Sequence, residues 1–164
     1  VGLGGLGYMA VKLAHAMGAE VTLFTRSLGK SDDAYRLGAS RVVLSTDENQ
    51  MFEVANTFDV IIDTVPYTHD LTYVPTLALD GTLVLVGLVG ELEQTINTVP
   101  MIMGRHSISA SMISGIRETH FCAEHNIVPD VEMINMQDIN TAYEHMQKSD
   151  VKYRFVIDMA SLKG

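Results

Sequence analysis

The sequence opens with Val1-Gly2-Leu3-Gly4-Gly5-Leu6-Gly7, in which the glycines at positions 2, 4 and 7 have the spacing G-x-G-x-x-G. This spacing is typical of a turn that leads from a strand into a helix and holds the pyrophosphate of a dinucleotide. One glycine permits the tight turn, one lets the backbone approach the pyrophosphate, and one lets the helix pack closely on the strand. We therefore expect a dinucleotide site formed by Gly2, Leu3, Gly4, Gly5, Leu6 and Gly7.

The residues after the glycines favour this interpretation over a flexible glycine-rich terminus. Residues 8–17 favour a helix that Gly18 would end, and residues 20–25 favour a β-strand. The start of such a helix, at residues 6–9, offers N–H groups and the positive end of its dipole to a phosphate. A chain with a formal net charge of -9 can hold a polyanion in this way.

Helices and strands alternate over the first 130 residues at lengths typical of an α/β protein. The unbroken apolar centre of residues 58–64 indicates a parallel strand buried on both faces. Because parallel neighbours need crossover connections, we predict an α/β fold, a doubly wound parallel sheet of the Rossmann type. Only Val1 precedes the glycines, so we expect its first strand to be truncated and the chain to be part of a longer protein. The predicted strands are 20–25, 41–44, 58–64, 82–87 and 107–112, and the predicted helices are 8–17, 31–37, 53–55 and 71–78.

The pattern changes near residue 130. Residues 138–147 favour an amphipathic helix, and residues 152–158 favour a strand of alternating polarity. We therefore divide the chain into a dinucleotide-binding domain, residues 1–130, and a C-terminal segment, residues 131–164, that belongs to a different layer.

The end of the first strand after the glycines favours NADP over NAD. An NAD site places Asp or Glu there, about 20 residues past the glycines, to bind the ribose 2′-hydroxyl. Here hydroxyl groups, a guanidinium and an ammonium group stand in that place, and all of them can bind a 2′-phosphate. The alternative is that these are solvated turn residues. Asp32 and Asp33, a little further on, fit the cap of the next helix, which begins at Ser31, better than a ribose site. The expected 2′-phosphate ligands are Thr25, Arg26, Ser27 and Lys30.

Composition limits the classes of function. The formal net charge of -9 disfavours nucleic acid and anionic membranes as partners, because both bind clustered positive charge. No apolar run approaches the roughly 20 residues that a membrane-spanning helix needs. Cys122 is the single cysteine and cannot form a disulfide within the chain, and no signal-peptide pattern opens the sequence. We expect a soluble, cytoplasmic protein.

Several further stretches carry a family resemblance. They are Ile-Asp-Thr-Val (62–65), Asp-Gly-Thr-Leu-Val-Leu-Val-Gly (80–87), Gly-Arg (104–105), Ser-Met-Ile-Ser-Gly (111–115) and Asp-Val-Lys-Tyr-Arg-Phe-Val-Ile-Asp (150–158). With the glycine turn and the Thr-Arg-Ser segment, they resemble the zinc-containing medium-chain alcohol dehydrogenases. The similarity is greatest to the cinnamyl alcohol dehydrogenase branch and its bacterial broad-range NADP-dependent aldehyde reductases. It covers essentially the whole chain, and its closing stretch is more specific than the glycine motif.

The resemblance implies roles for residues further along the chain. Thr64 would contact the adenosine side of the cofactor. The residues that would line the nicotinamide end through backbone groups are Gly87, Ser111, Met112 and Ile113. Strand ends are where open α/β sheets bind their ligands, although these residues could also simply end strands.

The chain itself offers no clear zinc site. Cys122 and His125 are three residues apart on a predicted helix, but zinc sites need three or four ligands and no second paired motif accompanies them. We predict no metal ligand and no catalytic residue in this chain, and take Cys122 as a small buried apolar residue. The resemblance implies that an amino-terminal catalytic domain holds the zinc and that residues 131–164 return to it. It also makes the connection near residue 120 about four residues, or one helical turn, shorter than is usual in the family.

The predicted function is hydride transfer between NADPH and an aldehyde, with zinc as a Lewis acid in the parent enzyme. This chain would supply the cofactor-binding portion and be inactive alone. Two alternatives stay open: a non-catalytic dinucleotide-sensing module, and a zinc-independent quinone or enoyl reductase of the same superfamily. The expected partner is a small aldehyde or alcohol, and a homodimer is the oligomeric state to test.

Overall fold

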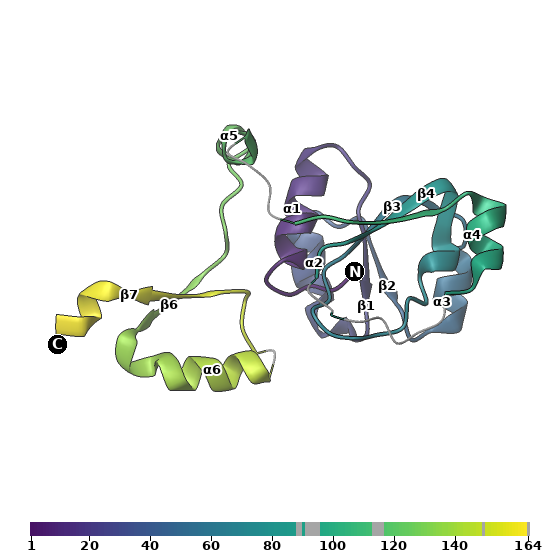
Figure 1. Ribbon diagram of the computed structural model, residues 1–164. Coiled ribbons are helices and arrows are strands. Elements are labelled where there is room, and N and C mark those ends of the chain that lie inside the picture. The colour runs from purple at the N-terminus through teal and green to yellow at the C-terminus, as the bar shows by residue number, and fades with distance from the viewer. Residues whose placement is uncertain (88–89, 91–95, 113–116, 149, 164) are drawn as a thin grey trace.

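The structure, a computed structural model, describes residues 1–87, 90, 96–112, 117–148 and 150–163 (Figure 1). Its first part contains α1 (Gly7–Ala16), β1 (Thr22–Thr25), the 3-10 helix η1 (Leu28–Lys30), α2 (Ser31–Leu37), β2 (Arg41–Leu44), α3 (Glu48–Glu53), β3 (Phe58–Asp63), the 3-10 helix η2 (Val74–Thr76) and β4 (Leu77–Leu85). Its second part contains α4 (Thr98–Gly104), β5 (Ser107–Ala110), α5 (Arg117–Glu124), β6 (Glu132–Asn135), η3 (Met136–Asp138), α6 (Ile139–Gln147), β7 (Phe155–Asp158) and η4 (Met159–Lys163).

The strands of the first 110 residues form two parallel sheets. β1 pairs with β2, and Leu23 lies opposite Val42. β4 lies between β3 and β5, and its Leu83 lies opposite both Ile61 and Ile108. In Figure 1, α1 and α2 lie on one side of the strands and α3 and α4 on the other. The predicted α/β, doubly wound parallel architecture is therefore confirmed.

Val1 and Gly2 connect the two sheets through backbone hydrogen bonds. The Gly2 amide donates to the carbonyl of Phe24 in β1 at 3.0 Å, and the amide of Thr64, directly after β3, donates to the Val1 carbonyl at 3.2 Å. An apolar cavity of about 270 Å³ lies among α1, β1 and β3. The glycine turn is therefore the place where the two sheets are held together.

Two apolar clusters fill the two sides of the strands. Leu23 and Phe24 are neighbours on β1 and belong to different clusters, because successive side chains of a strand point to opposite faces. The cluster beside α1 and α2 contains Leu3, Tyr8, Val11, Leu23, Ala34, Leu37, Ala39 and Tyr153. The other contains Phe24, Val43, Val54, Ile61, Leu71, Tyr73, Val74, Leu77 and Leu83.

The C-terminal segment forms a small sheet of its own. β6 and β7 pair in parallel, with Ile134 opposite Ile157, and α6 connects them (Figure 1). α6 and β7 lie within the helix and strand predicted at 138–147 and 152–158, whereas β6 has no counterpart among the predicted strands. The change of pattern near residue 130 thus has a structural basis, while the division into residues 1–130 and 131–164 stays a prediction.

The expectation that β3 is buried on both faces is wrong. Val60 is 56% exposed and Ile62 is 38% exposed, whereas Ile61 is 4% exposed. Val60 and Ile62 line the apolar cavity beside α1, and Ile61 packs in the core on the opposite face. Only the face of β3 that carries Ile61 therefore packs in the core.

The prediction of a helix over residues 71–78 is also wrong. Only the 3-10 helix η2 forms, and β4 already begins at Leu77. Pro75 has no N–H for a helical hydrogen bond, and it disfavours a helical conformation in the residue before it. Asp80 and Gly81, which precede the strand predicted at 82–87, lie within β4.

Helix α2 begins without the side-chain cap expected from Ser31, Asp32 and Asp33. Its N-cap position is Lys30, and no side-chain cap hydrogen bond is present. The preceding helix η1 runs directly into α2, and the Ser31 amide donates to a carbonyl of η1. The Asp33 side chain instead accepts hydrogen bonds from Arg36 and Lys152.

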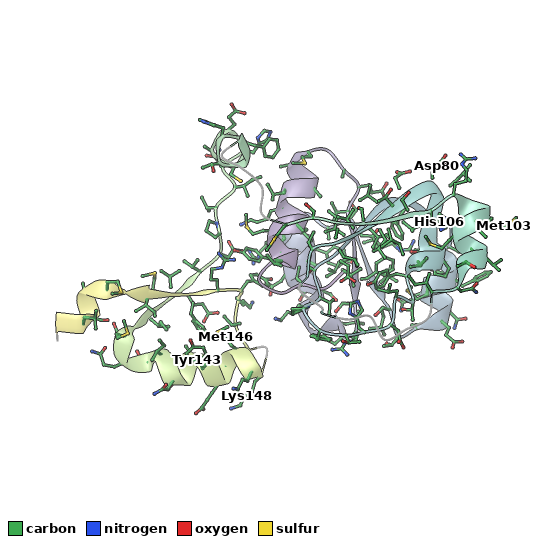
Figure 2. The ribbon with its side chains drawn as sticks, viewed as in Figure 1. Asp80, Met103, His106, Tyr143, Met146 and Lys148 are labelled. Atoms are coloured by element: carbon green, nitrogen blue, oxygen red, sulfur yellow. The ribbon has the colours of Figure 1, made fainter. Side chains whose placement is uncertain are left out.

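The methionines contribute little to the buried core of the described residues. Met103 on α4 is 76% exposed and Met146 on α6 is 54% exposed (Figure 2). Neither apolar cluster has a methionine among its buried members, as far as the structure describes the chain. The buried volume is filled mainly by Val, Leu, Tyr and Ala.

Replacing Gly7 by alanine should destabilise the fold. A Cβ at Gly7 would lie 2.1 Å from the Gly2 carbonyl oxygen, which is backbone. We expect Gly7→Ala to lower the free energy of unfolding by about 1–3 kcal/mol, the usual cost of overpacking. Gly4→Ala is the matched control, because nothing lies within 4 Å of its Cβ position, and should change that free energy by less than about 0.5 kcal/mol. Urea unfolding measures both variants, and equal stabilities would contradict the steric argument.

Candidate functional site

A cleft of about 1180 Å³ lies at the carboxyl ends of β1 and β3. The glycine turn, the residues after β1, the loop after β3 and part of the C-terminal segment line it. Open α/β sheets bind ligands at this edge. Its volume exceeds the roughly 300–1,000 Å³ of pockets for drug-sized ligands, so it is large enough for an extended molecule.

The glycine turn forms one wall of this cleft. The residues of the turn that line it are Gly2, Leu3, Gly4, Gly5 and Leu6. Gly7 lies behind them, against the backbone of Gly2. Leu6, the N-cap residue of α1, makes no side-chain cap hydrogen bond, and the first turn of α1 contains no acidic residue. The amides and the positive dipole end of α1 therefore favour an anion here.

The predicted 2′-phosphate ligands lie together at one end of the cleft. Thr25, Arg26, Ser27 and Lys30 all line it. The Thr25 hydroxyl donates to the Ser27 carbonyl at 2.9 Å and accepts from the Ser27 amide at 3.3 Å, so it shapes the turn that presents Arg26. Neither Arg26 nor Lys30 forms an ion pair with any residue that the structure describes. This end of the cleft therefore has uncompensated positive charge.

Thr64 also lines the cleft, but its hydroxyl is engaged by the chain itself. It donates to the Val1 carbonyl at 2.7 Å, and the residue is 8% exposed. Thr64 therefore fastens the glycine turn to the end of β3, and its side chain shapes the cleft from behind.

A buried hydrogen-bond network anchors the loop that follows Thr64. The Asp63 side chain accepts from the Tyr73 hydroxyl and, at 3.0 Å, from the Val65 amide. His69 Nε2 lies 2.9 Å from Asp63 Oδ2 and 2.7 Å from the Tyr73 hydroxyl oxygen. A buried carboxylate is costly unless hydrogen bonds satisfy it, and Asp63 is only 1% exposed. The network fixes both ends of a loop, residues 64–72, that lines the cleft.

The C-terminal segment supplies a further wall of the cleft, next to the start of α1. The Tyr153 ring stacks on Tyr8 with centroids 4.5 Å apart, and Lys30 Nζ lies 5.8 Å from the Tyr153 centroid. Arg154 Nη2 lies 3.5 Å from the Gly5 carbonyl oxygen. The stretch 150–158, which the sequence marked only as a family signature, therefore reaches the glycine turn.

Gly87, Ser111 and Met112, which were expected at the nicotinamide end, are not part of this cleft lining. Gly87 packs against the Val65 carbonyl oxygen, which would lie 2.2 Å from a Cβ at that position. Ser111 follows β5, and its amide donates to the Leu85 carbonyl at 3.0 Å, while Met112 is 77% exposed. Ile113 lies outside the described residues. Their role at the nicotinamide stays a prediction.

A family profile described as "Zinc-binding dehydrogenase" matches residues 5–127. The chain belongs to this family. Relatives among the zinc-binding dehydrogenases include the NADP-dependent alcohol dehydrogenase C 1 of Mycolicibacterium smegmatis, 47% identical over 100% of this chain and 48% of the relative. The aldehyde reductase YahK of Escherichia coli is 48% identical over 99% of this chain and 48% of its own length. The chain thus spans about half the length of the curated relatives it matches.

Solved structures of cinnamyl alcohol dehydrogenases share the fold. The enzyme from Sorghum bicolor is 40% identical with a TM-score of 0.90, over 97% of this chain and 46% of that one. The Helicobacter pylori enzyme, described as complexed with NADP(H), is 38% identical with a TM-score of 0.82 over the same shares. The resemblance stated from the sequence is therefore confirmed.

The family description names zinc, yet no candidate metal centre is present among the described residues. No group of three or more His, Cys, Asp or Glu side chains there could hold a metal ion. Cys122 is half-buried, so the expectation of a buried apolar cysteine is wrong, and His125 is engaged with the Phe121 carbonyl at 3.0 Å. The residues described here do not fit a zinc ion.

Sequence reasoning missed part of the cleft wall. Tyr67, His69, Tyr153 and Arg154 line it without having been predicted. Tyr67 and His69 lie in a loop with no sequence motif, and the C-terminal pair is more than 80 residues further along the chain.

No helix in the described part of this dehydrogenase chain is long and apolar enough to cross a membrane.

Tyr73 makes the stability of the network depend on pH. Burial, the hydrogen bond to Asp63 and the charge of Asp63 raise the pKa of Tyr73 well above its ordinary value of 10.0. The folded protein keeps the Tyr73 proton at a pH where the unfolded chain releases it. The stability that results is fully present below pH 10 and is lost as the pH rises above it.

We therefore expect the free energy of unfolding to fall more steeply above about pH 10 in the wild type than in Tyr73→Phe, which has no phenol to titrate. Denaturant unfolding at about pH 9 and about pH 11 measures the two slopes. Tyr35→Phe is the control, because Tyr35 is 52% exposed and lies outside the cleft. If Tyr73→Phe had the same slope as Tyr35→Phe, Tyr73 would not carry this pH dependence.

Proposed function

We propose that this chain is the cofactor-binding portion of an NADP(H)-dependent alcohol dehydrogenase that acts as an aldehyde reductase. One observation carries the proposal. Arg26 and Lys30 lie in the cleft beside the glycine turn, and neither has an acidic partner among the described residues. In a chain with a formal net charge of -9, two such cations favour a ligand with a phosphate at this position.

The relatives support the nature of the cofactor and of the reaction. One is named as an NADP-dependent alcohol dehydrogenase and another as an aldehyde reductase, and a similar structure is described as complexed with NADP(H). Because the chain spans about half of such relatives, the activity belongs to a longer protein in this proposal. The substrate would be a small aldehyde or alcohol.

The chain's own residues would bind and orient the cofactor. The glycine turn and the amides at the start of α1 would hold the pyrophosphate. Thr25, Arg26, Ser27 and Lys30 would hold the 2′-phosphate, and Thr64 would lie against the adenosine. Gly87, Ser111, Met112 and Ile113 would border the nicotinamide. When bound, NADPH supplies the hydride for the carbonyl carbon of the aldehyde.

In this proposal, the zinc ligands are residues other than those that the structure describes. The zinc-binding dehydrogenase family implies the metal, whereas the described part of this chain has no suitable group of ligands. In this proposal residues 1–130 are the NADP-binding domain and residues 131–164 return to the catalytic domain that holds the zinc. A dinucleotide-sensing module is the second candidate, because the described residues contain no metal-binding group. Metal content and aldehyde turnover of the full-length protein distinguish the two.

Removing the phosphate-binding cations should change cofactor preference. We expect the full-length protein to bind NADPH more tightly than NADH. Lys30→Ala and Arg26→Ala should each weaken NADPH binding about 10- to 100-fold, the effect of losing one charged hydrogen bond, and leave NADH binding nearly unchanged. Titration followed by nicotinamide fluorescence measures both dissociation constants.

Arg41→Ala is the control for these variants, because Arg41 is an exposed cation paired with Glu53 outside the cleft. It should keep the wild-type preference. Equal affinities of the wild-type protein for NADPH and NADH would contradict the proposed cofactor.

The 164-residue chain by itself should have no alcohol dehydrogenase activity, because its described residues lack a metal-binding group. The assay is aldehyde-dependent oxidation of NADPH by the metal-free chain, after NADPH binding has shown that the cleft is intact. Measurable turnover in that assay would disprove the assignment of catalysis to other residues.

A further inference from the structure

The loop of residues 64–72 carries an aromatic side chain to the phosphate-binding end of the cleft. Tyr67 is 47% exposed and lines the cleft together with Arg26. The Arg26 Nη2 group donates to the Tyr67 hydroxyl at 2.6 Å, and Arg26 Cζ lies 5.3 Å from the centroid of the Tyr67 ring. No sequence motif singles out Tyr67, yet its hydrogen bond and its ring both fix the guanidinium of Arg26.

A guanidinium held in this way is better prepared to bind a phosphate. Arginine loses much rotational freedom when it is immobilised, and a partner that fixes it beforehand reduces that cost on binding. The guanidinium has five N–H donors, and its bond to Tyr67 uses only part of them. The Tyr67 hydroxyl accepts the bond from Arg26, so its own O–H can still donate to a phosphate oxygen.

The buried network next to β3 determines where Tyr67 lies. His69 Nδ1 lies 2.8 Å from the Tyr67 carbonyl oxygen, and its other ring nitrogen contacts Asp63 and Tyr73. The rings of Tyr67 and His69 also meet edge to face, 6.2 Å apart. A single imidazole therefore connects the backbone of Tyr67 to a buried carboxylate at the end of β3.

We propose that Tyr67 is a specificity-determining residue for the 2′-phosphate of NADP(H), and that His69 is a positioning residue that acts through Tyr67. This inference rests on the proposed function, because it assumes that the cleft binds NADP(H). In this proposal the phosphate site has two walls. The turn of residues 25–30 supplies the cations Arg26 and Lys30, and the loop of residues 64–72 orients Arg26.

The primary test is Tyr67→Phe in the full-length protein, which removes the hydroxyl and keeps the ring. We expect its dissociation constant for NADPH to rise about three- to tenfold, the usual effect of losing one hydrogen bond, and that for NADH to change less than about twofold. The readout is the ratio of the two dissociation constants, because a partly unfolded sample changes both constants alike. Tyr35→Phe is the matched control, since Tyr35 is exposed to a similar extent, 52%, and lies outside the cleft.

A double-mutant cycle tests the positioning role of His69. His69→Ala should lower the preference for NADPH, and the pair His69→Ala/Tyr67→Phe should lower it no further than Tyr67→Phe alone. Additive losses would overturn the claim that His69 acts through Tyr67.

The outcomes separate this inference from the proposed function. A wild-type preference for NADPH that Tyr67→Phe leaves intact would overturn the role of Tyr67 and uphold the proposed cofactor. A wild-type protein without preference for NADPH would overturn the proposed cofactor, and this inference with it. A preference that falls in Tyr67→Phe and stays in Tyr35→Phe supports both.

Discussion

The structure depends on one close approach between Gly7 and Gly2. A Cβ on Gly7 would lie 2.1 Å from the Gly2 carbonyl oxygen, so the first residue of α1 can rest on the turn only because it has no side chain. Gly2 in turn donates to Phe24 of β1, and Val1 beside it accepts from Thr64 after β3. The position of α1, the contact between the two sheets and the shape of the cleft all follow from this packing of backbone on backbone.

Charge is arranged locally, against the overall balance of the chain. The formal net charge is -9, yet the cleft gathers Arg26, Lys30 and Arg154, with the start of α1 adding its dipole. Several other cations of the chain are paired, for example Lys12 with Asp130. The overall negative charge therefore does not exclude an anion from this cleft, because short-range hydrogen bonds from charged donors depend on local geometry more than on net charge.

The sequence predicted the parts of the fold and of the candidate site that local chemistry determines. The glycine spacing and the alternation of elements were sufficient for the fold class, and the family followed from resemblance in further stretches such as residues 150–158. The glycine turn and residues 25–30 do meet in one cleft. The errors arose where tertiary context decides. Pro75 and early strand pairing replaced a helix, and a cavity left one face of β3 exposed. Tyr67 and His69 could not have been found, because a contact across 41 residues, such as that between Arg26 and Tyr67, leaves no periodic signal in the sequence.

The wall formed by Tyr153 and Arg154 has a consequence for the order in which the cleft is built. Arg154 contacts the Gly5 carbonyl across 149 residues. One side of the cleft is therefore synthesised well before the other. Closing so long a loop lowers the conformational entropy of the chain before the contacts between its ends can offset that loss. A nascent chain therefore assembles the turn and its neighbouring strands first, and the pocket gains its last wall only when residues 150–158 have left the ribosome.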